Sequence, residues 1–173
     1  MIELKQPNYY QDVKQFHQTF RHPGAERPTP IPLERGIKRA TWTVEEAAVE
    51  FLHQSSRNEA EFLAAIEVLK AGIDRAVEKS LNETYPTNEV EQLVGQGDAL
   101  TDALYFIMGS FVEAGLEPGP LFEIVQQANM AKLGPDGQPI FRESDQKVMK
   151  PAGWLPPEPQ LEAEVLQQMQ EKA

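Results

Sequence analysis

Apolar positions recur with the period of an α-helix along most of this 173-residue chain. The longest uncharged run lies between Asp102 and Glu113, and it continues a stretch that begins at Asp98. A helix that is apolar nearly all round is typical of a buried helix. Two buried carboxylates then need a cation or another partner, because an uncompensated buried charge is strongly unfavourable. The apolar stripe of this helix consists of Leu93, Leu100, Leu104, Ile107 and Phe111, and the opposite side of Asp98, Asp102, Tyr105 and Gly109.

Helical periodicity predicts most of the remaining chain as well. Four prolines between residues 22 and 32, and a second proline-rich run over 151–159, instead predict extended straps, because proline cannot continue a helix. The sequence therefore predicts an all-α fold, an antiparallel bundle of about four to five helices with extended proline-rich segments. The predicted helices span 9–20, 33–55, 58–79, 88–114 and 120–130, with a further candidate at 162–170.

The length suits one compact domain over residues 1–157, followed by a C-terminal tail over 158–173 that could be helical. Between the last bundle helix and this tail, residues 139–142 and 147–150 could pair as a small hairpin or remain an extended flap. Apolar stripes on several helix faces predict a homodimer, because a second copy would cover the faces that one chain leaves exposed.

Composition narrows the choice of partners. The chain carries 27 acidic and 16 basic residues, a net charge of −11, so it lacks the basic footprint that a duplex nucleic acid requires. The absence of cysteine excludes disulfides and thiolate metal sites and makes a reducing cytoplasm the simplest setting. No apolar run approaches the roughly 18 residues that span a bilayer, and the N-terminus lacks a signal-peptide core, so we expect no membrane association.

A second pair of acids, Glu46 and Glu50, lies on the predicted helix 33–55, opposite its apolar seam. One such pair is usually a solvated face, but its co-occurrence with Asp98 and Asp102 points to a site for a hard cation, Mg²⁺ or Mn²⁺, between two helices. A di-iron site is disfavoured, because Glu50-Phe-Leu-His53 supplies only one of the two Glu-x-x-His motifs expected for it.

Several motifs in order resemble one family. An acid-bearing helix is followed by a second that ends Asp-x-x-x-Asp-Ala-Leu-Tyr105, then by Asn129-Met-Ala-Lys-Leu-Gly-Pro-Asp-Gly and by Lys147-Val-Met-Lys-Pro-Ala-Gly-Trp154. This set is similar to the MazG-like, all-α nucleoside triphosphate pyrophosphohydrolases, the superfamily of phosphoribosyl-ATP pyrophosphohydrolases and dimeric dUTPases. The resemblance runs from about residue 10 to residue 157 and includes Phe16-His and Arg-Pro-Thr-Pro30.

The first motif of that family is Glu-Glu-x-x-Glu, and this chain has Glu45-Glu46-Ala-Ala-Val-Glu50. One alignment keeps Glu46 and Glu50 and places Ala47 at the second glutamate. The other keeps Glu45 and Glu46 and places Val49 at the last acid. Either alignment loses one carboxylate, and we prefer the first because it keeps an i, i+4 pair on one helical face.

The resemblance implies hydrolysis of a nucleotide between its α and β phosphorus, giving a monophosphate and pyrophosphate, with Mg²⁺ or Mn²⁺ held by the helix acids. It implies Glu46 as general base or bridging ligand. The second acidic motif, often Glu-x-x-Asp in the family, is here the variant Asp98-x-x-x-Asp102. The expected metal ligands are Glu46, Glu50, Asp98 and Asp102, and the expected substrate contacts are Asn129, Lys132, Lys147 and Lys150.

Each substrate contact also has a structural interpretation, since exposed lysines are usually solvated and Asn129 could cap a helix end. Trp42 and Tyr105 could stack on a base or belong to the core.

Three functions remain open. The favoured function is a house-cleaning NTP or dNTP pyrophosphohydrolase. If the lost carboxylate has removed activity, the chain would instead be a non-catalytic helical nucleotide-binding or interaction module. A phosphoribosyl-ATP pyrophosphohydrolase would keep the chemistry with another substrate.

Overall fold

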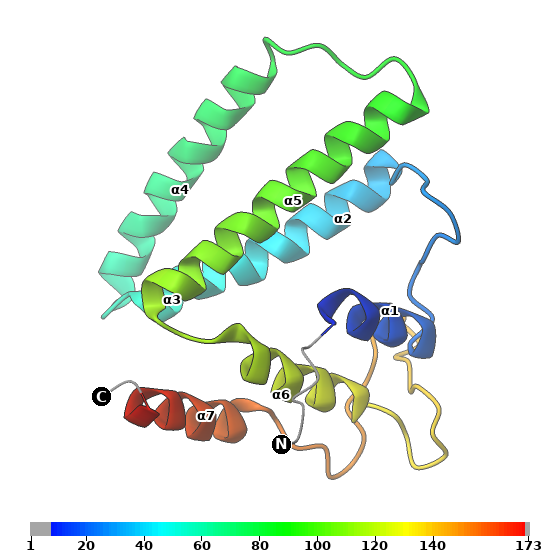
Figure 1. The fold of residues 1–173 in the computed structure, drawn as a ribbon, viewed down its shortest axis with the longest axis vertical. Helices are drawn as coiled ribbons and strands as arrows, with labels where there is room; N and C mark the ends of the chain where they lie inside the picture. The colour runs from blue at the N-terminus through cyan, green and yellow to red at the C-terminus, as the bar shows by residue number, and fades with distance from the viewer. Residues whose placement is uncertain (1–7, 172–173) are drawn as a thin grey trace. The chain divides into compact units, whose positions relative to one another are not determined.

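The structure, a computed structural model, describes residues 8–171 and is helical throughout its regular part. Helices α2, η1 and α3 follow one another without a break, so the described chain forms six helical rods (Figure 1). The predicted all-α class is confirmed, and each rod lies within a few residues of its predicted range. The elements are α1 (Tyr9–Thr19), α2 (Leu33–Val44), the π-helix η1 (Glu45–Glu50), α3 (Phe51–Ser55), α4 (Glu59–Ser80), α5 (Glu89–Ala114), α6 (Pro118–Met130) and α7 (Glu158–Glu171).

Two of the long helices begin at asparagines, because the side chain satisfies a backbone donor that the first turn leaves free. Asn58 Oδ1 accepts a hydrogen bond from the Glu61 backbone at 3.0 Å, and Asn88 Oδ1 accepts one from the Glu91 backbone at 3.0 Å. The Glu61 carboxylate in turn accepts from the backbone N–H of Arg57 at 3.0 Å. Asn58 therefore caps α4, which agrees with the predicted helix start at residue 58.

The chain divides into two compact units, one of residues 27–107 and one that combines the residues before 27 with those after 107. Helix α5 begins in the first unit and ends in the second. No single helix in the described part of the chain is long and apolar enough to cross a membrane. Helices α5 and α6 reach the necessary length and apolar composition only when the two are taken together, as a bent pair.

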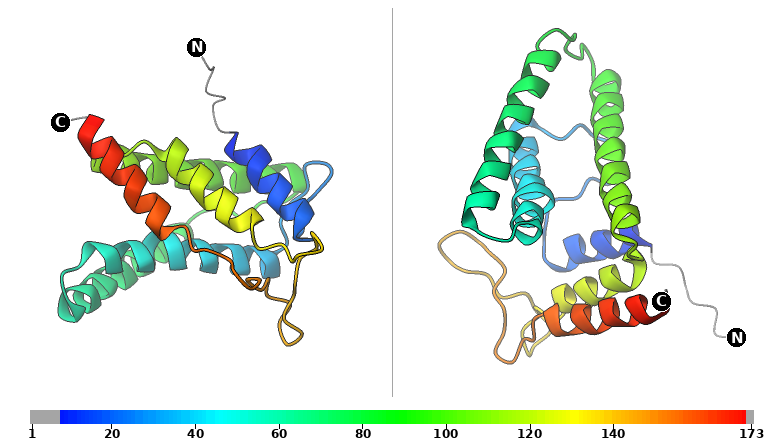
Figure 2. Two further views of the ribbon diagram at one scale, coloured as in Figure 1. Left: turned by 90° about the horizontal axis from the view of Figure 1, so that it is seen from below. Right: turned by 90° about the vertical axis from the view of Figure 1, so that its left-hand side faces the viewer.

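Within the unit 27–107, α4 runs back along the rod formed by α2, η1 and α3, and α5 reverses direction again (Figures 1 and 2). The proline-rich strap before α2 is extended, as predicted. The Gln96 side chain on α5 holds it at Ile31, where its Oε1 accepts from the backbone N–H at 2.8 Å and its Nε2 donates to the backbone carbonyl at 2.9 Å.

The expectation that α5 is buried is wrong for the single chain. No residue of α5 is buried, and its apolar stripe is open to solvent, with Leu100 61% exposed and Leu104 53% exposed. Tyr105, on the side that carries the aspartates, is 79% exposed. The apolar side chains of α5 are therefore open to solvent in the described chain, and the prediction of a buried helix is not met there.

In the second unit, α6 packs between α1 and α7. The ring of Tyr9 meets the edge of Phe122 at 4.6 Å between centroids, and Gln126 Nε2 donates to the backbone carbonyl of Asp12 at 2.9 Å. Phe20, at the end of α1, is 1% exposed and is the only buried large apolar side chain among residues 8–171.

The C-terminal segment is helical as α7, and one buried glutamine fixes it. Gln168 is 5% exposed. Its Oε1 accepts from the backbone N–H of Glu117 at 2.8 Å, and its Nε2 donates to the Glu117 carbonyl at 3.1 Å. The side chain therefore replaces backbone pairing at the turn that leads into α6.

Replacing Gln168 by alanine is expected to destabilise the protein by about 2 kcal/mol, because two backbone groups lose their partner away from water. The melting temperature should fall by about 4–8 °C. Gln167→Ala, on the exposed face of the same helix, is the matched control, and both variants can be measured by circular dichroism. Equal melting temperatures for the two variants would contradict the role given to Gln168.

The hairpin alternative for the segment after α6 is confirmed. Isolated antiparallel bridges join Phe141 to Val148 and Leu133 to Pro139. Arg142 and Asp145 form a bidentate ion pair across the tip, and Arg142 lowers the pKa of the Asp145 carboxyl to about 2. The hairpin returns the chain to the C-terminal end of α6, where the candidate lysines lie.

Candidate functional site

The glutamates of the first motif lie in a π-helical segment. The backbone N–H of Phe51 is shared between the carbonyls of Ala48 and of Glu46, five residues earlier. The N–H of Glu45 is shared between the carbonyls of Trp42 and of Thr41, four residues earlier. A single π-turn inside an α-helix accommodates one additional residue, and such turns are frequent at functional sites. η1 is therefore a one-residue expansion of the helix between α2 and α3.

This expansion changes which carboxylates share a face. In a π-turn a residue five positions on lies roughly above the first, as a residue four positions on does in an α-helix. Glu45 and Glu50 are therefore stacked like an i, i+4 pair, and Glu46 and Glu50 like an i, i+3 pair. Neither alignment of the motif has to lose a carboxylate, because the additional residue is absorbed by η1. The expected ligand set left out Glu45 because only regular α-helical spacing was considered, although the additional residue between Glu46 and Glu50 was a signal in the sequence.

The acids of η1 and those of α5 are not gathered into one site in this structure. Glu46, Glu50, Asp98 and Asp102 are all exposed, and Gln54 Nε2 donates to Glu50 Oε1 at 2.6 Å. Among residues 8–171, no three acidic or histidine side chains are gathered closely enough to hold a metal ion. The predicted ligand set therefore remains a prediction.

The four expected substrate contacts are all in the second unit, at the end of α6 and on the hairpin. Lys132 Nζ donates to Asn129 Oδ1 at 2.7 Å. Burial lowers the pKa of Lys132, and the nearby charges of Lys150 and Lys147 lower it further. None of the three lysines forms an ion pair with a carboxylate in the described chain. Three neighbouring cations without an anion in an acidic protein indicate an anion-binding surface, which we call the lysine cluster.

Trp154, which carried no assigned role in the sequence, organises this cluster. Its Nε1 donates to the backbone carbonyl of Ala128 in α6 at 2.8 Å. Lys150 Nζ lies 4.1 Å from the centre of its ring, and Lys132 Nζ lies 6.0 Å from it. The indole ring therefore anchors the segment after the hairpin and holds Lys150 by a cation–π contact. Its position in Lys-Pro-Ala-Gly-Trp154 was the sequence signal.

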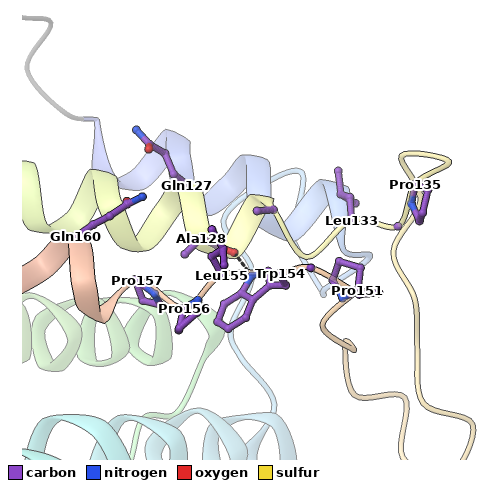
Figure 3. Close-up of a pocket in the computed structure, with 14 residues that line it drawn as sticks. Gln127, Ala128, Leu133, Pro135, Pro151, Trp154, Leu155, Pro156, Pro157 and Gln160 are labelled. Carbon is purple, nitrogen blue, oxygen red and sulfur yellow. Dashed lines mark hydrogen bonds between the residues drawn. The ribbon is translucent and has the colours of Figure 1, made fainter.

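A cavity of about 470 Å³ opens beside the same indole ring (Figure 3). Its wall combines the C-terminal part of α6, the turn after it and the proline-rich strap before α7. Most of the lining is apolar or backbone, and Gln127 and Gln160 also belong to it, although the Gln127 side chain points away from Trp154 (Figure 3). The remaining lining residues are Ala128, Ala131, Leu133, Gly134, Pro135, Pro151, Ala152, Gly153, Trp154, Leu155, Pro156 and Pro157.

The two aromatic residues considered for base stacking are outside the cavity lining. Trp42 is 43% exposed, and the guanidinium of Arg35 lies 5.2 Å from its ring centre. Tyr105 is 79% exposed on α5. Neither belongs to a core within the single chain.

The comparisons agree with this geometry. The model of the phosphoribosyl-ATP pyrophosphohydrolase family matches residues 13–129, well over half of the chain. A crystal structure from Exiguobacterium sp. 255-15, described as a "putative NTP pyrophosphohydrolase", is 86% identical with a TM-score of 0.96, and the alignment covers 98% of this chain and 100% of that chain. The comparison with curated proteins found no match. The matched segment contains α2, η1, α3 and α5, the helices that carry the acids, and the chain belongs to the phosphoribosyl-ATP pyrophosphohydrolase family.

Proposed function

We propose that the protein is a magnesium-dependent nucleoside triphosphate pyrophosphohydrolase, which cleaves between the α and β phosphorus and releases a monophosphate and pyrophosphate. The observation that carries the proposal is the π-helical segment η1, which contains Glu45, Glu46 and Glu50 and lies within the segment that matches the family. The experiment that tests it is product identification with a panel of NTPs and dNTPs, with and without EDTA.

The donor chemistry of these residues fits Mg²⁺, which prefers carboxylate and water oxygens and shares them with substrate phosphates. Glu45, Glu46 and Glu50 would hold it from η1, and Asp98 and Asp102 from α5. When bound, Mg²⁺ supplies charge neutralisation at the phosphates and a more acidic water. Glu46 is the residue we assign to accept the proton from the attacking water.

Deletion of Val49 tests the role of η1. The deletion leaves Glu45-Glu46-Ala-Ala-Glu, so η1 should become a regular α-helix with the three carboxylates still on one face. We expect a folded protein that binds Mn²⁺ as the parent does, measured by electron paramagnetic resonance. Glu45→Gln should weaken Mn²⁺ binding by about tenfold, because affinity follows the number of charged ligands.

Deletion of Ala64 from the regular helix α4 is the matched control. It rotates all later residues of that helix by about 100° and should unfold the protein or lower its melting temperature far more. If the two deletions are equally damaging, η1 does not absorb an additional residue. If Glu45→Gln binds Mn²⁺ as the parent does, Glu45 is no ligand.

For the substrate, we favour a nucleoside or deoxynucleoside triphosphate over phosphoribosyl-ATP, which the description of the matching family names. A single assay on phosphoribosyl-ATP separates these two. The non-catalytic module is disfavoured, because it rested on a lost carboxylate and the proposed ligand set on η1 includes a third glutamate, Glu45. The cytoplasmic setting stays a prediction.

We further propose that the protein is a homodimer. The support is the open apolar surface of the unit 27–107, in which each helix carries exposed large apolar side chains. A second copy would cover the stripe of α5, and burial of apolar area of this kind is the main favourable term in association. Examples from α4 and α5 are Val68 at 69%, Val77 at 52%, Val94 at 67% and Leu100 at 61% exposed.

A further inference from the structure

The cavity beside Trp154 and the lysine cluster share one side chain, and this juxtaposition carries an inference. Lys150 lies on the Trp154 ring, and the same ring lines the cavity. A ligand whose charged end meets the lysines therefore has its neutral part beside the indole. We infer that the cavity receives the base and sugar of a nucleotide whose phosphates lie on the lysine cluster. The inference rests on the proposed function, because it takes a nucleotide as the ligand.

The chemistry of the wall fits a nucleoside. A volume of about 470 Å³ lies within the usual range for small-molecule sites. An aromatic ring, prolines and leucines offer flat apolar contacts, which suit the faces of a base. Gln160, an exposed residue of the lining, has a side-chain amide with one acceptor and two donor hydrogens, which suits the edge of a base.

The charge distribution sets the orientation. The lysine cluster has no carboxylate partner in the described residues, so it favours the phosphates, and the neutral lining of the cavity favours the nucleoside. Asn129 orients Lys132 from the same turn of α6. Trp154 is held by its Nε1 bond to Ala128, so its ring needs no reorientation to receive a planar ligand.

A proline-rich peptide is the competing occupant, since aromatic and proline surfaces also bind extended chains. Two features favour the nucleotide. The three neighbouring lysines match several negative charges close together, and the amide of Gln160 matches the polar edge of a base.

Trp154 provides its own probe. The chain contains two tryptophans, so Trp42→Phe leaves Trp154 as the only one. The variant is titrated in EDTA, where no turnover occurs, with each of the four deoxynucleoside monophosphates, with 2-deoxyribose 5-phosphate and with inorganic pyrophosphate, while the fluorescence of Trp154 is recorded. We expect saturable quenching by at least one monophosphate, with a Kd at least about tenfold below that for the base-free sugar phosphate, the magnitude typical of base stacking on an aromatic ring.

Variants locate the two ends of the ligand. Lys150→Met should weaken monophosphate binding by about tenfold or more, through loss of a charge-assisted contact. Gln160→Ala should weaken the binding of monophosphates that contact the protein through the base, but it should leave the binding of pyrophosphate unchanged. Gln167→Ala, on the same helix outside the cavity, should change the binding of neither ligand. All three side chains are exposed, so these variants should fold.

The inference is overturned if no monophosphate changes Trp154 fluorescence at millimolar concentration, or if the base-free sugar phosphate binds as tightly as every monophosphate. Quenching of Trp154 fluorescence by a proline-rich peptide, with no response to nucleotides, would assign the cavity to the peptide and would also overturn the inference. These failures are separable from failure of the proposed function: pyrophosphate release with an unresponsive Trp154 refutes the cavity alone. Absence of turnover on every triphosphate refutes the enzymatic activity.

Discussion

Asp102→Asn is expected to lower turnover by about 10²- to 10³-fold, a loss typical for removal of one charge-stabilising group from an active site. Asparagine keeps the size of the side chain but removes the carboxylate charge that a hard cation requires. The measurement is separate quantification of pyrophosphate and orthophosphate released from the best triphosphate in Mg²⁺. Pyrophosphate should be the first product of the parent protein and should disappear with EDTA.

The control for this variant is Asp74→Asn, which removes one exposed carboxylate from α4 and should leave turnover unchanged. The two variants have the same change in net charge, so any difference reports position and not general electrostatics. Orthophosphate as the first product would refute cleavage between the α and β phosphorus. Full activity in Asp102→Asn would remove α5 from the proposed site.

Placing a charge in the apolar stripe of α5 is expected to have the largest effect on assembly. Leu100→Glu and Leu104→Glu would each bury a carboxylate without a partner if a second copy covers the stripe, and this is strongly unfavourable. The dimer dissociation constant should rise by about a thousandfold, which corresponds to about 4 kcal/mol. Sedimentation velocity over a range of protein concentrations measures it.

Thr84→Glu, which adds the same charge in the exposed connection before α5, is the control and should leave the sedimentation behaviour of the parent unchanged. A parent protein that is monomeric at micromolar concentration would refute the homodimer. A parent dimer that persists in both leucine variants would move the interface away from this stripe.

The helices were predictable because their signals are local. The apolar period, the prolines of the straps and a cap such as Asn58 act within a few residues, so each predicted rod was confirmed. Burial was harder to predict, since it depends on what lies opposite a helix. The stripe of α5 predicted a buried helix, yet Leu104 is 53% exposed in the single chain. An apolar pattern on one helix does not specify whether another segment lies against it.

The candidate site divides in the same way. Residue types and order predicted Glu46, Glu50 and the lysines, and they led to the correct family. The choice between the two motif alignments, however, depended on whether a backbone bond spans four or five residues, and one-letter patterns do not encode this. The bond from Phe51 to Glu46 decides it and makes Glu45 available.

The sequence by itself determined the all-α class, the helix limits, the family and the chemical types of the candidate groups, because each depends on local periodicity or on ordered motifs. Only the tertiary structure decided that η1 absorbs an additional residue and that Trp154 joins the lysine cluster to a cavity. It also decided that the stripe of α5 lies open in one chain. The physical reason is that such relations depend on hydrogen bonds and contacts between segments whose separation in sequence, such as that of Trp154 from Ala128, carries no periodic signal.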